Sequence, residues 1–305
     1  MISQKLYETV LFDTICRAST VIPDDVQTAF EKAIELETYS NAKDGLSNTY
    51  ESLNKSKICH TPACSDTGWP LFYFKIGNDC ELEGGIIGLE ESARSAVKKA
   101  SIEGLLRKTM KHPLTGYDPG FNIGLNIPHF TYKFVPGDQI ELNFVPKGGG
   151  SECFGGTRSA VIAFADGKVG IKKFIIDSFV AATRTGGICP PSVVGIGIGG
   201  TANIAANLAK EAACLRVVGE RHPEEDIAAM EEELYSALNA LGIGVMSIGG
   251  KTSVFAVNIE YAYTHIAGIA CAMSCNCMVA RRATTRIAAD RSVEILNNPN
   301  WFIGR

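Results

Sequence analysis

The sequence predicts an α/β (α+β) fold: a single large domain with a mixed β-sheet and packed helices. With 305 residues, the chain is long enough to bury a sizeable core. Its composition, 46% hydrophobic and 20% charged, is typical of a globular protein and excludes disordered, collagen-like and coiled-coil chains. Helical and strand patterns do not alternate strictly, because two strands follow one another mid-chain. This order favours a mixed sheet over a doubly wound parallel one.

The N-terminal half of the chain carries helix and strand signals in turn. Pro23, Asp24 and Asp25 mark a helix start, because proline and acidic residues suit the first helical turn. Aromatic and β-branched residues then predict a strand over 71–76, followed by a helical pattern over 89–110. Two apolar runs separated by Pro-Gly-Asp predict a hairpin formed by residues 130–135 and 139–145.

The C-terminal half continues this pattern. The sequence predicts strands at 192–196 and 253–259 and helices at 203–214 and 223–241. We find no internal repeat, low-complexity tract or long polar linker. One domain over residues 1–305 is therefore the simplest organisation.

Charge and hydropathy limit the possible partners and the compartment. The net charge of −4 gives no basic footprint for nucleic acid or an anionic membrane. The N-terminus lacks an apolar stretch of signal-peptide length. The longest uncharged run, 185–209, is interrupted by Pro190, Pro191 and several glycines, so no transmembrane helix is expected. We expect a cytoplasmic protein that binds a small molecule or another protein.

The ten cysteines are the most informative part of the composition. In a reducing compartment, abundant cysteines more often bind metals or take part in catalysis than form disulfides. Cys64, Cys189 and Cys277 lie in turn-like segments, where a metal ligand can be aimed freely. The spacing matches no zinc pattern, because the chain has no C-x₂-C pair. From spacing alone, a metal site and a set of inert thiols both remain possible.

Two glycine-rich segments are ambiguous. Residues 195–200 match the G-x-G-x-x-G pattern of dinucleotide sites, with Glu220 twenty positions further on. Such a motif normally lies in an early βαβ unit, so the alternative is a close strand-to-helix turn. Lys147–Ser151 could hold an anion with its backbone N–H groups or form a mobile loop, and it lacks the ending of a phosphate-binding loop.

Five motifs, taken in order, resemble the iron–sulfur hydro-lyases that comprise class I fumarases and L(+)-tartrate dehydratases, in their α-subunit type. The resemblance extends from residue 64 to residue 287. The segments that carry it are Cys64–Gly68, Asn122–Pro128, Lys147–Ser151, Cys189–Pro191 with Gly199–Thr201, and Cys277 with Arg281. Most are weak singly, but their shared order makes the signal strong.

The resemblance implies a [4Fe–4S] cluster held by Cys64, Cys189 and Cys277, with one iron lacking a protein ligand. Such an iron can act as a Lewis acid toward a substrate hydroxyl and carboxylate. The choice of Cys277 rests on its register with Arg281, and Cys275 remains the alternative third ligand.

The resemblance also implies roles in catalysis. Asp66 occupies the position of the base that removes a proton, although an Asx-turn would also explain an aspartate there. His265 lies twelve residues before Cys277, the family's spacing for a substrate-contacting histidine (277 − 265 = 12). A lone histidine in an apolar stretch is otherwise usually a core residue.

Substrate-binding positions follow in the same way. Arg107 resembles an arginine that binds a substrate carboxylate, and its alternative is a solvated helix face. Gly148, Gly149 and Gly150 would let the backbone approach the substrate closely. Ser65 stands where the family usually has glutamine, which leaves the identity of the substrate open.

The implied function is the reversible hydration or dehydration of a small 2-hydroxydicarboxylate, with fumarate and malate first and L(+)-tartrate to oxaloacetate second. Nothing after Arg282 resembles the family's second, swivelling domain. We therefore expect a separate β subunit and an α₂β₂ heterotetramer. Two alternatives of other classes are a non-catalytic iron–sulfur or zinc accessory protein and a nucleotide-binding oxidoreductase.

Overall fold

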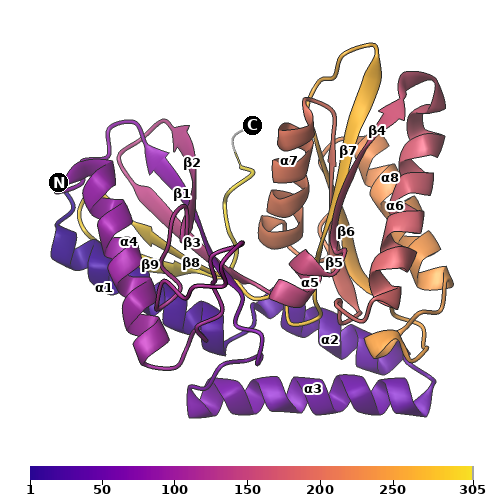
Figure 1. The fold of residues 1–305 in the computed structure, drawn as a ribbon, viewed down its shortest axis with the longest axis horizontal. Helices are drawn as coiled ribbons and strands as arrows, with labels where there is room; N and C mark the ends of the chain where they lie inside the picture. Colours follow the sequence, from indigo (N-terminus) through magenta and orange to yellow (C-terminus); the bar gives the residue numbers. More distant parts are fainter. Residues whose placement is uncertain (304–305) are drawn as a thin grey trace. The chain divides into compact units, whose positions relative to one another are not determined.

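The computed structural model describes residues 1–303 and divides the chain into two compact units (Figure 1). Unit 1 comprises Met1–Pro23, Leu53–Lys147 and the segment from Arg281 onward. Unit 2 comprises Asp24–Ser52 and Gly148–Ala280. Neither unit is one continuous stretch of chain, because the backbone passes from one to the other repeatedly.

Unit 1 is built on a mixed sheet with the strand order β2-β1-β3-β8-β9. Its helices α1 and α4 pack on the sheet through one hydrophobic core, which includes the aromatic rings of Phe72, Phe74 and Phe144. The elements are α1 (Gln4–Thr20), β1 (Trp69–Gly77), α4 (Gly85–Ile102), β2 (His129–Val135), β3 (Ile140–Lys147), β8 (Ala283–Ile287) and β9 (Val293–Leu296).

The hairpin predicted over 130–145 is wrong in its pairing, although both strands exist. β1 lies between them, parallel to β2 and antiparallel to β3. The connecting turn crosses the end of β1 at Gly77, whose N–H donates to the Gln139 carbonyl at 2.8 Å. A Cβ at Gly77 would lie 2.3 Å from the Gly137 carbonyl oxygen. The missing side chain therefore makes room for the crossing.

The helix predicted over 89–110 begins earlier and ends sooner, since α4 spans Gly85–Ile102. Gly104 has a φ of +82°, a left-handed conformation that glycine adopts readily and that cannot continue a helix. Residues 107–110 consequently belong to an irregular segment. Arg107 is thus not on a solvated helix face.

Unit 2 contains a second mixed sheet, with the order β4-β7-β5-β6. β5 pairs parallel with β6, and β7 pairs antiparallel with β4 and β5. The elements are α2 (Asp24–Leu36), α5 (Gly149–Cys153), β4 (Thr157–Ala163), a 3₁₀ turn η1 (Phe164–Asp166), α6 (Gly167–Arg184), β5 (Ser192–Ile198), α7 (Ala202–Leu215), α8 (Glu225–Ala240), a second turn η2 (Val245–Ser247), β6 (Val254–Tyr261) and β7 (Gly268–Asn276). The helix α3 (Ser40–Cys59) contributes residues to both units.

Helices cover both faces of the unit 2 sheet (Figure 1). Along β7, Cys271, Met273 and Cys275 pack with α6 and α8 in the main core. The alternate residues Ala270 and Ala272 pack against α7. This division follows from the period of two in a strand, which points successive side chains to opposite faces.

The predicted α/β (α+β) class is confirmed, with two mixed sheets in place of the single sheet expected. The strands at 71–76, 192–196 and 253–259 correspond to β1, β5 and β6, and three predicted helices correspond to α2, α7 and α8. Among the described residues, no helix combines the length and apolar character needed to cross a membrane.

Candidate functional site

The segment Cys64–Gly68 forms a tight connection directly before β1 in unit 1. Two arginines hold its backbone. The Arg107 guanidinium donates from Nη1 to the Ser65 carbonyl at 2.7 Å, and the Arg281 guanidinium donates from Nη2 to the Asp66 carbonyl at 2.6 Å. Asp66 is half-buried and Ser65 is exposed. The carbonyls on both sides of the Asp66 Cα are therefore held by charged donors.

Arg107 is itself fixed by its backbone. Its N–H donates to Thr67 Oγ1 at 2.8 Å, and its carbonyl accepts from Asn122 Nδ2 at 2.8 Å. Asn122 is 1% exposed, and its Oδ1 accepts from the Thr109 N–H at 3.0 Å. The motif Asn122–Pro128 carried no assigned role in the sequence. The structure shows that its first residue positions Arg107.

In unit 2, the segments that carry Cys189 and Cys277 are neighbours. The Met278 N–H donates to the Cys189 carbonyl at 2.9 Å. Cys189 precedes β5 and Cys277 follows β7, and both thiols are half-buried. Because β5 and β7 are antiparallel, the start of one lies beside the end of the other. The register of the sheet thus brings these two segments together.

Cys275 and Cys271 have a different environment. Both are 0% exposed and belong to the hydrophobic core of unit 2. Burial raises the pKa of the Cys271 thiol to about 12, because a thiolate loses its hydration there. Of the cysteines at the end of β7, only Cys277 lies outside the core.

The glycine segment Gly148–Gly150 begins α5 and lies next to the segment before Cys189. Thr185 Oγ1 donates to the Phe154 carbonyl at 2.7 Å. A Cβ at Gly187 would lie 2.1 Å from the Phe154 Cβ and 3.0 Å from the Gly150 carbonyl oxygen. Gly187 therefore permits the close packing of α5 against this segment.

His265 lies at the other end of the unit 2 sheet. It is exposed in the loop between β6 and β7, where its Nδ1 accepts from the Ala267 N–H at 3.1 Å. Cys277 follows the far end of β7, a strand of nine residues. At about 3.3 Å per residue, such a strand is about 30 Å long. The structure therefore gathers Cys189, Cys277 and the glycine segment in unit 2, but not His265.

The G-x-G-x-x-G glycines serve helix packing. A Cβ at Gly195 would lie 2.1 Å from the Ala209 carbonyl oxygen, and one at Gly197 would lie 1.9 Å from the Ala205 carbonyl oxygen. Both glycines therefore let α7 approach β5 closely. This arrangement matches the packing interpretation of the motif.

Cys64, Cys189 and Cys277 are half-buried thiols at loop positions, and thiolates are the usual ligands of iron–sulfur clusters. The donor chemistry of these three residues therefore fits a cluster. Cys64 belongs to unit 1, and the other two belong to unit 2. Within residues 1–303, no three or more His, Cys, Asp or Glu side chains form a ready metal-binding group.

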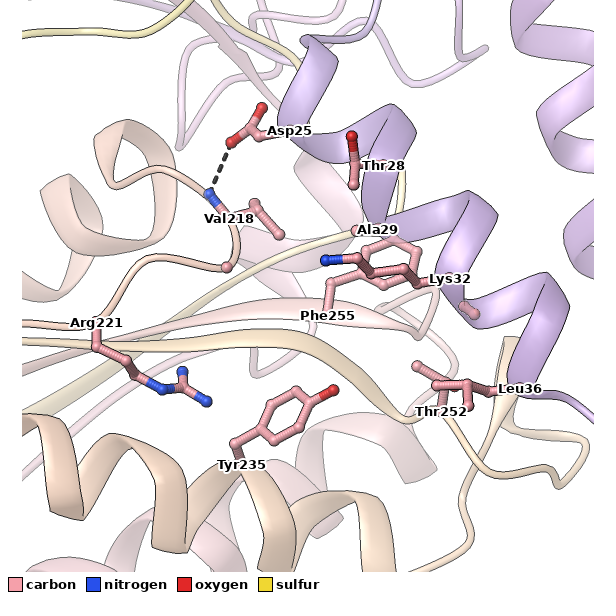
Figure 2. A pocket seen from close by; sticks show the side chains of 12 residues that line it. Asp25, Thr28, Ala29, Lys32, Leu36, Val218, Arg221, Tyr235, Thr252 and Phe255 are labelled. Atoms are coloured by element: carbon pink, nitrogen blue, oxygen red, sulfur yellow. Dashed lines mark hydrogen bonds between the residues drawn. The ribbon is translucent and has the colours of Figure 1, made fainter.

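Unit 2 also contains a cavity of about 190 Å³ between α2, α8 and β6 (Figure 2). Lys32 from α2 and Arg221 line it together with the rings of Tyr235 and Phe255. Arg221 forms an ion pair with Glu232 and packs on the Tyr235 ring. Asp25 accepts from the Val218 N–H at 2.7 Å. The lining contains two cationic side chains and one carboxylate, and none of the predicted site residues lines the cavity.

Comparison with known proteins identifies the family of this chain. The profile described as fumarate hydratase (Fumerase) matches residues 8–286. The chain belongs to the fumarate hydratase (Fumerase) family. The family is one of iron–sulfur-dependent hydro-lyases, so this fumarase-family chain is a carbon–oxygen lyase.

Similar proteins extend over nearly the same length as this fumarase-family chain. A Methanocaldococcus jannaschii protein, provisionally named L(+)-tartrate dehydratase subunit alpha, is 38% identical over 92% of this chain and 97% of its own length. The L(+)-tartrate dehydratase subunit alpha of Escherichia coli strain UTI89 is 34% identical over 92% of this chain and 90% of its own length. The protein of the same name from strain K12 is 33% identical over the same shares.

Sequence reasoning missed two residues of the site. In the sequence, Arg281 only favoured Cys277 over Cys275 as a ligand, and Asn122 was only the first residue of a family motif. Both act on backbone atoms, Arg281 on the Asp66 carbonyl and Asn122 on the Arg107 carbonyl. Burial of a charged or amide side chain in a loop is the property that distinguishes them, and a single sequence does not show it.

Proposed function

We propose that the chain is the α subunit of a [4Fe–4S]-dependent hydro-lyase that acts on a small 2-hydroxydicarboxylate. The observation that carries this proposal is the hydrogen bond from Met278 to the Cys189 carbonyl, which pairs the segments of Cys189 and Cys277. The burial of Cys275 supports Cys277 as the third ligand. Cys64 would complete the set. When bound, such a cluster supplies a Lewis-acidic iron for the substrate hydroxyl and carboxylate.

The connectivity of the chain supports a common role for these segments. In unit 1, Trp69 at the start of β1 pairs with Lys147 at the end of β3. Cys64–Gly68 directly precedes Trp69, and the glycine segment begins one residue after Lys147. The chain returns from Cys277 to Arg281, which binds the Asp66 carbonyl. Pairing within unit 1 thus places the Cys64 segment beside Lys147, which precedes the glycine segment in the chain, and beside Arg281, which follows Cys277 in the chain.

The residues of the chain have separate tasks in the proposed reaction. Dehydration breaks one C–H bond and the neighbouring C–O bond, and the electron pair of the C–H bond forms the new carbon–carbon double bond. The hydroxyl leaves as water by taking a proton from solvent, and the proton that Asp66 accepts returns to solvent, so that one water is lost overall. The Asp66 carboxylate takes the proton from carbon as general base. Arg107 uses one N–H group on the Ser65 carbonyl, and the other N–H groups of its planar fork bind a substrate carboxylate. Ser65 and the backbone of Gly148, Gly149 and Gly150 contact the substrate.

His265 is the second proposed catalytic residue, and it lies in the loop between β6 and β7. It is separated from Cys277 by the length of β7, so the two side chains lie at opposite ends of that strand. We retain it as a substrate contact on the family spacing alone. Replacing it with asparagine tests this role through KM.

L(+)-tartrate is the first candidate substrate, because the similar proteins bear the name of its dehydratase. Malate and fumarate are the second, because the family profile is that of fumarate hydratase. The name "subunit alpha" supports a β subunit as partner in an α₂β₂ enzyme. The count of ten cysteines supports a cytoplasmic location, because in a reducing compartment abundant cysteines more often bind metals or take part in catalysis than form disulfides.

The test is an assay of the anaerobically reconstituted chain, alone and co-expressed with its candidate β subunit. Malate, fumarate and both tartrate enantiomers are the substrates. We expect conversion of L(+)-tartrate that requires both subunits and disappears in Asp66→Asn, with the cluster retained. Loss of the proton acceptor should lower kcat about 10²- to 10⁴-fold. A cluster-loaded pair that converts none of the four compounds contradicts the proposal.

A further inference from the structure

The contact between Arg281 and the Cys64–Gly68 segment joins two parts of unit 1 that are distant in sequence. Arg281 is 4% exposed, and its guanidinium donates to the Asp66 carbonyl at 2.6 Å. A longer contact of 3.5 Å reaches the Pro146 carbonyl, at the end of β3. A hydrogen bond from a charged donor is stronger than one between neutral groups. Arg281 is therefore an anchor for the backbone of the Cys64–Gly68 segment.

Two guanidinium groups hold the two peptide planes that flank Asp66. Arg107 binds the Ser65 carbonyl, which lies in the plane before the Asp66 Cα, and Arg281 binds the carbonyl of the plane after it. Because a peptide unit is planar, the orientation of these two planes sets φ and ψ of Asp66. The direction of the Asp66 Cα–Cβ bond follows from the same backbone atoms. Fixing the two carbonyls therefore restricts the positions open to the carboxylate.

We propose that Arg281 is a positioning residue: it fixes the backbone of Asp66 and so directs the carboxylate that removes the substrate proton. The inference rests on the proposed function, in which Asp66 is the general base. Only three residues separate Arg281 from Cys277 along the chain. Within unit 1, the hydrogen bond therefore holds the start of the Arg281 segment against the turn that carries Cys64 and Asp66.

The experiment compares Arg281→Met and Arg281→Lys with matched variants of the next residue. Arg282 is 6% exposed and donates to Asn298 Oδ1 at 3.2 Å, so it is equally buried but bonded elsewhere. Amide hydrogen exchange of residues 64–68 is measured by mass spectrometry on each cluster-free chain. kcat and KM for L(+)-tartrate are measured on each cluster-loaded enzyme with its partner subunit.

In Arg281→Met we expect exchange at residues 64–68 to rise about tenfold and kcat to fall about 10- to 100-fold, because a small displacement of a catalytic group is costly. KM should change by less than about threefold, since the substrate carboxylates keep their own ligands. Arg281→Lys should lie between Arg281→Met and the wild type. Arg282→Met should leave both the exchange and kcat near the wild-type values.

Unchanged exchange at residues 64–68 in Arg281→Met, or an equal rise in Arg282→Met, would overturn the inference. If Arg281→Met does not fold, the same criteria apply to Arg281→Lys and Arg282→Lys. If exchange at residues 64–68 rises in Arg281→Met but the wild-type enzyme converts no dicarboxylate, only the proposed function is overturned. The anchoring of the Asp66 backbone by Arg281 would then stand.

Discussion

Cys275 and Cys277 are two residues apart, yet they occupy opposite environments. Cys275 lies on β7 in the core of unit 2, and Cys277 lies just beyond the end of that strand. Sequence spacing left the two as alternatives, because a C-x-C pair has no intrinsic asymmetry. The asymmetry comes from the last residue of β7, Asn276, after which the chain leaves the sheet and its core.

Replacement of each cysteine by alanine separates these roles. Cys277→Ala should remove at least one iron from the reconstituted chain, because a cluster ligand is lost. Cys275→Ala should keep the full iron content and lower the free energy of unfolding by about 1 kcal/mol, since a small buried group is deleted. Iron and sulfide content per chain and thermal unfolding check both. Equal iron loss in the two variants would contradict the assignment of Cys277.

The contact between Arg281 and the Asp66 backbone could not be predicted from the sequence. Cys64, Cys189, Cys277 and Asp66 could be named because they stand in short motifs. The bond from Arg281 to the Asp66 carbonyl spans 215 positions and involves a backbone oxygen that every residue has. No local pattern encodes such a contact. The antiparallel pairing of β8 with β3 brings Arg281 to the edge of the sheet at which the Cys64–Gly68 segment enters β1.

The packing of α7 on β5 depends on residues without side chains. A Cβ at Gly197 would lie 1.9 Å from the Ala205 carbonyl oxygen, a distance that no real contact reaches. Gly197→Ala should therefore lower the free energy of unfolding by about 1–3 kcal/mol, the usual cost of overpacking. Denaturant unfolding measures the change.

Gly45 provides the matched control. It lies inside α3, and a Cβ there would meet only the Val245 side chain, at an ordinary 3.5 Å. Gly45→Ala should raise the free energy of unfolding by about 0.5–1 kcal/mol, because alanine favours the helix. Equal destabilisation by the two substitutions would show that α7 does not require the glycine of β5.

Elements with strong local patterns were predictable, and those defined by distant contacts were not. Helix α8 and strand β6 follow from periodicity and composition. The pairing of β2 and β3 could not be predicted, because the turn between them looks like a hairpin turn and only Gly77 lets it cross β1. β7 also gave a weak signal, since it consists largely of small residues that are buried on both faces.

Over the whole chain, the ten thiols fall into classes that chemical labelling can distinguish. Cys59 and Cys153 are exposed, whereas Cys214 and Cys271 are buried. Burial raises the pKa of Cys16 to about 11 and that of Cys271 to about 12. A raised thiol pKa lowers the thiolate fraction, so at pH 8 only about 10⁻⁴ of Cys271 would be in the reactive form. Cys271 should therefore remain unlabelled in the folded protein at this pH.

The same labelling tests the cluster ligands together. We expect iodoacetamide to modify the exposed cysteines of both the cluster-free and the cluster-loaded protein. Cys64, Cys189 and Cys277 should react in the cluster-free protein and be protected in the loaded one, because ligation occupies the thiolate. Peptide mass spectrometry reports each site. Reaction of any of the three at the same rate in both forms would remove it from the ligand set.

The division into two units lay beyond sequence reasoning for a physical reason. A linker rich in polar residues usually separates domains, and this chain has none. Each unit is instead assembled from separate stretches, such as Asp24–Ser52 within unit 2. Which stretch joins which core depends on contacts between residues far apart in sequence. Composition along the chain does not record those contacts.

The segments of unit 1 also impose an order on biosynthesis. Thr14 on α1 contacts Thr285 on β8 across 271 positions, with their hydroxyl oxygens 2.6 Å apart. A ribosome that has reached Ala280 has therefore made all of unit 2, but it has not made the strand that pairs with β3. Until β8 emerges, β3 is an open sheet edge, and open edges recruit other chains. The nascent protein thus exposes this edge of β3 until β8 has left the ribosome.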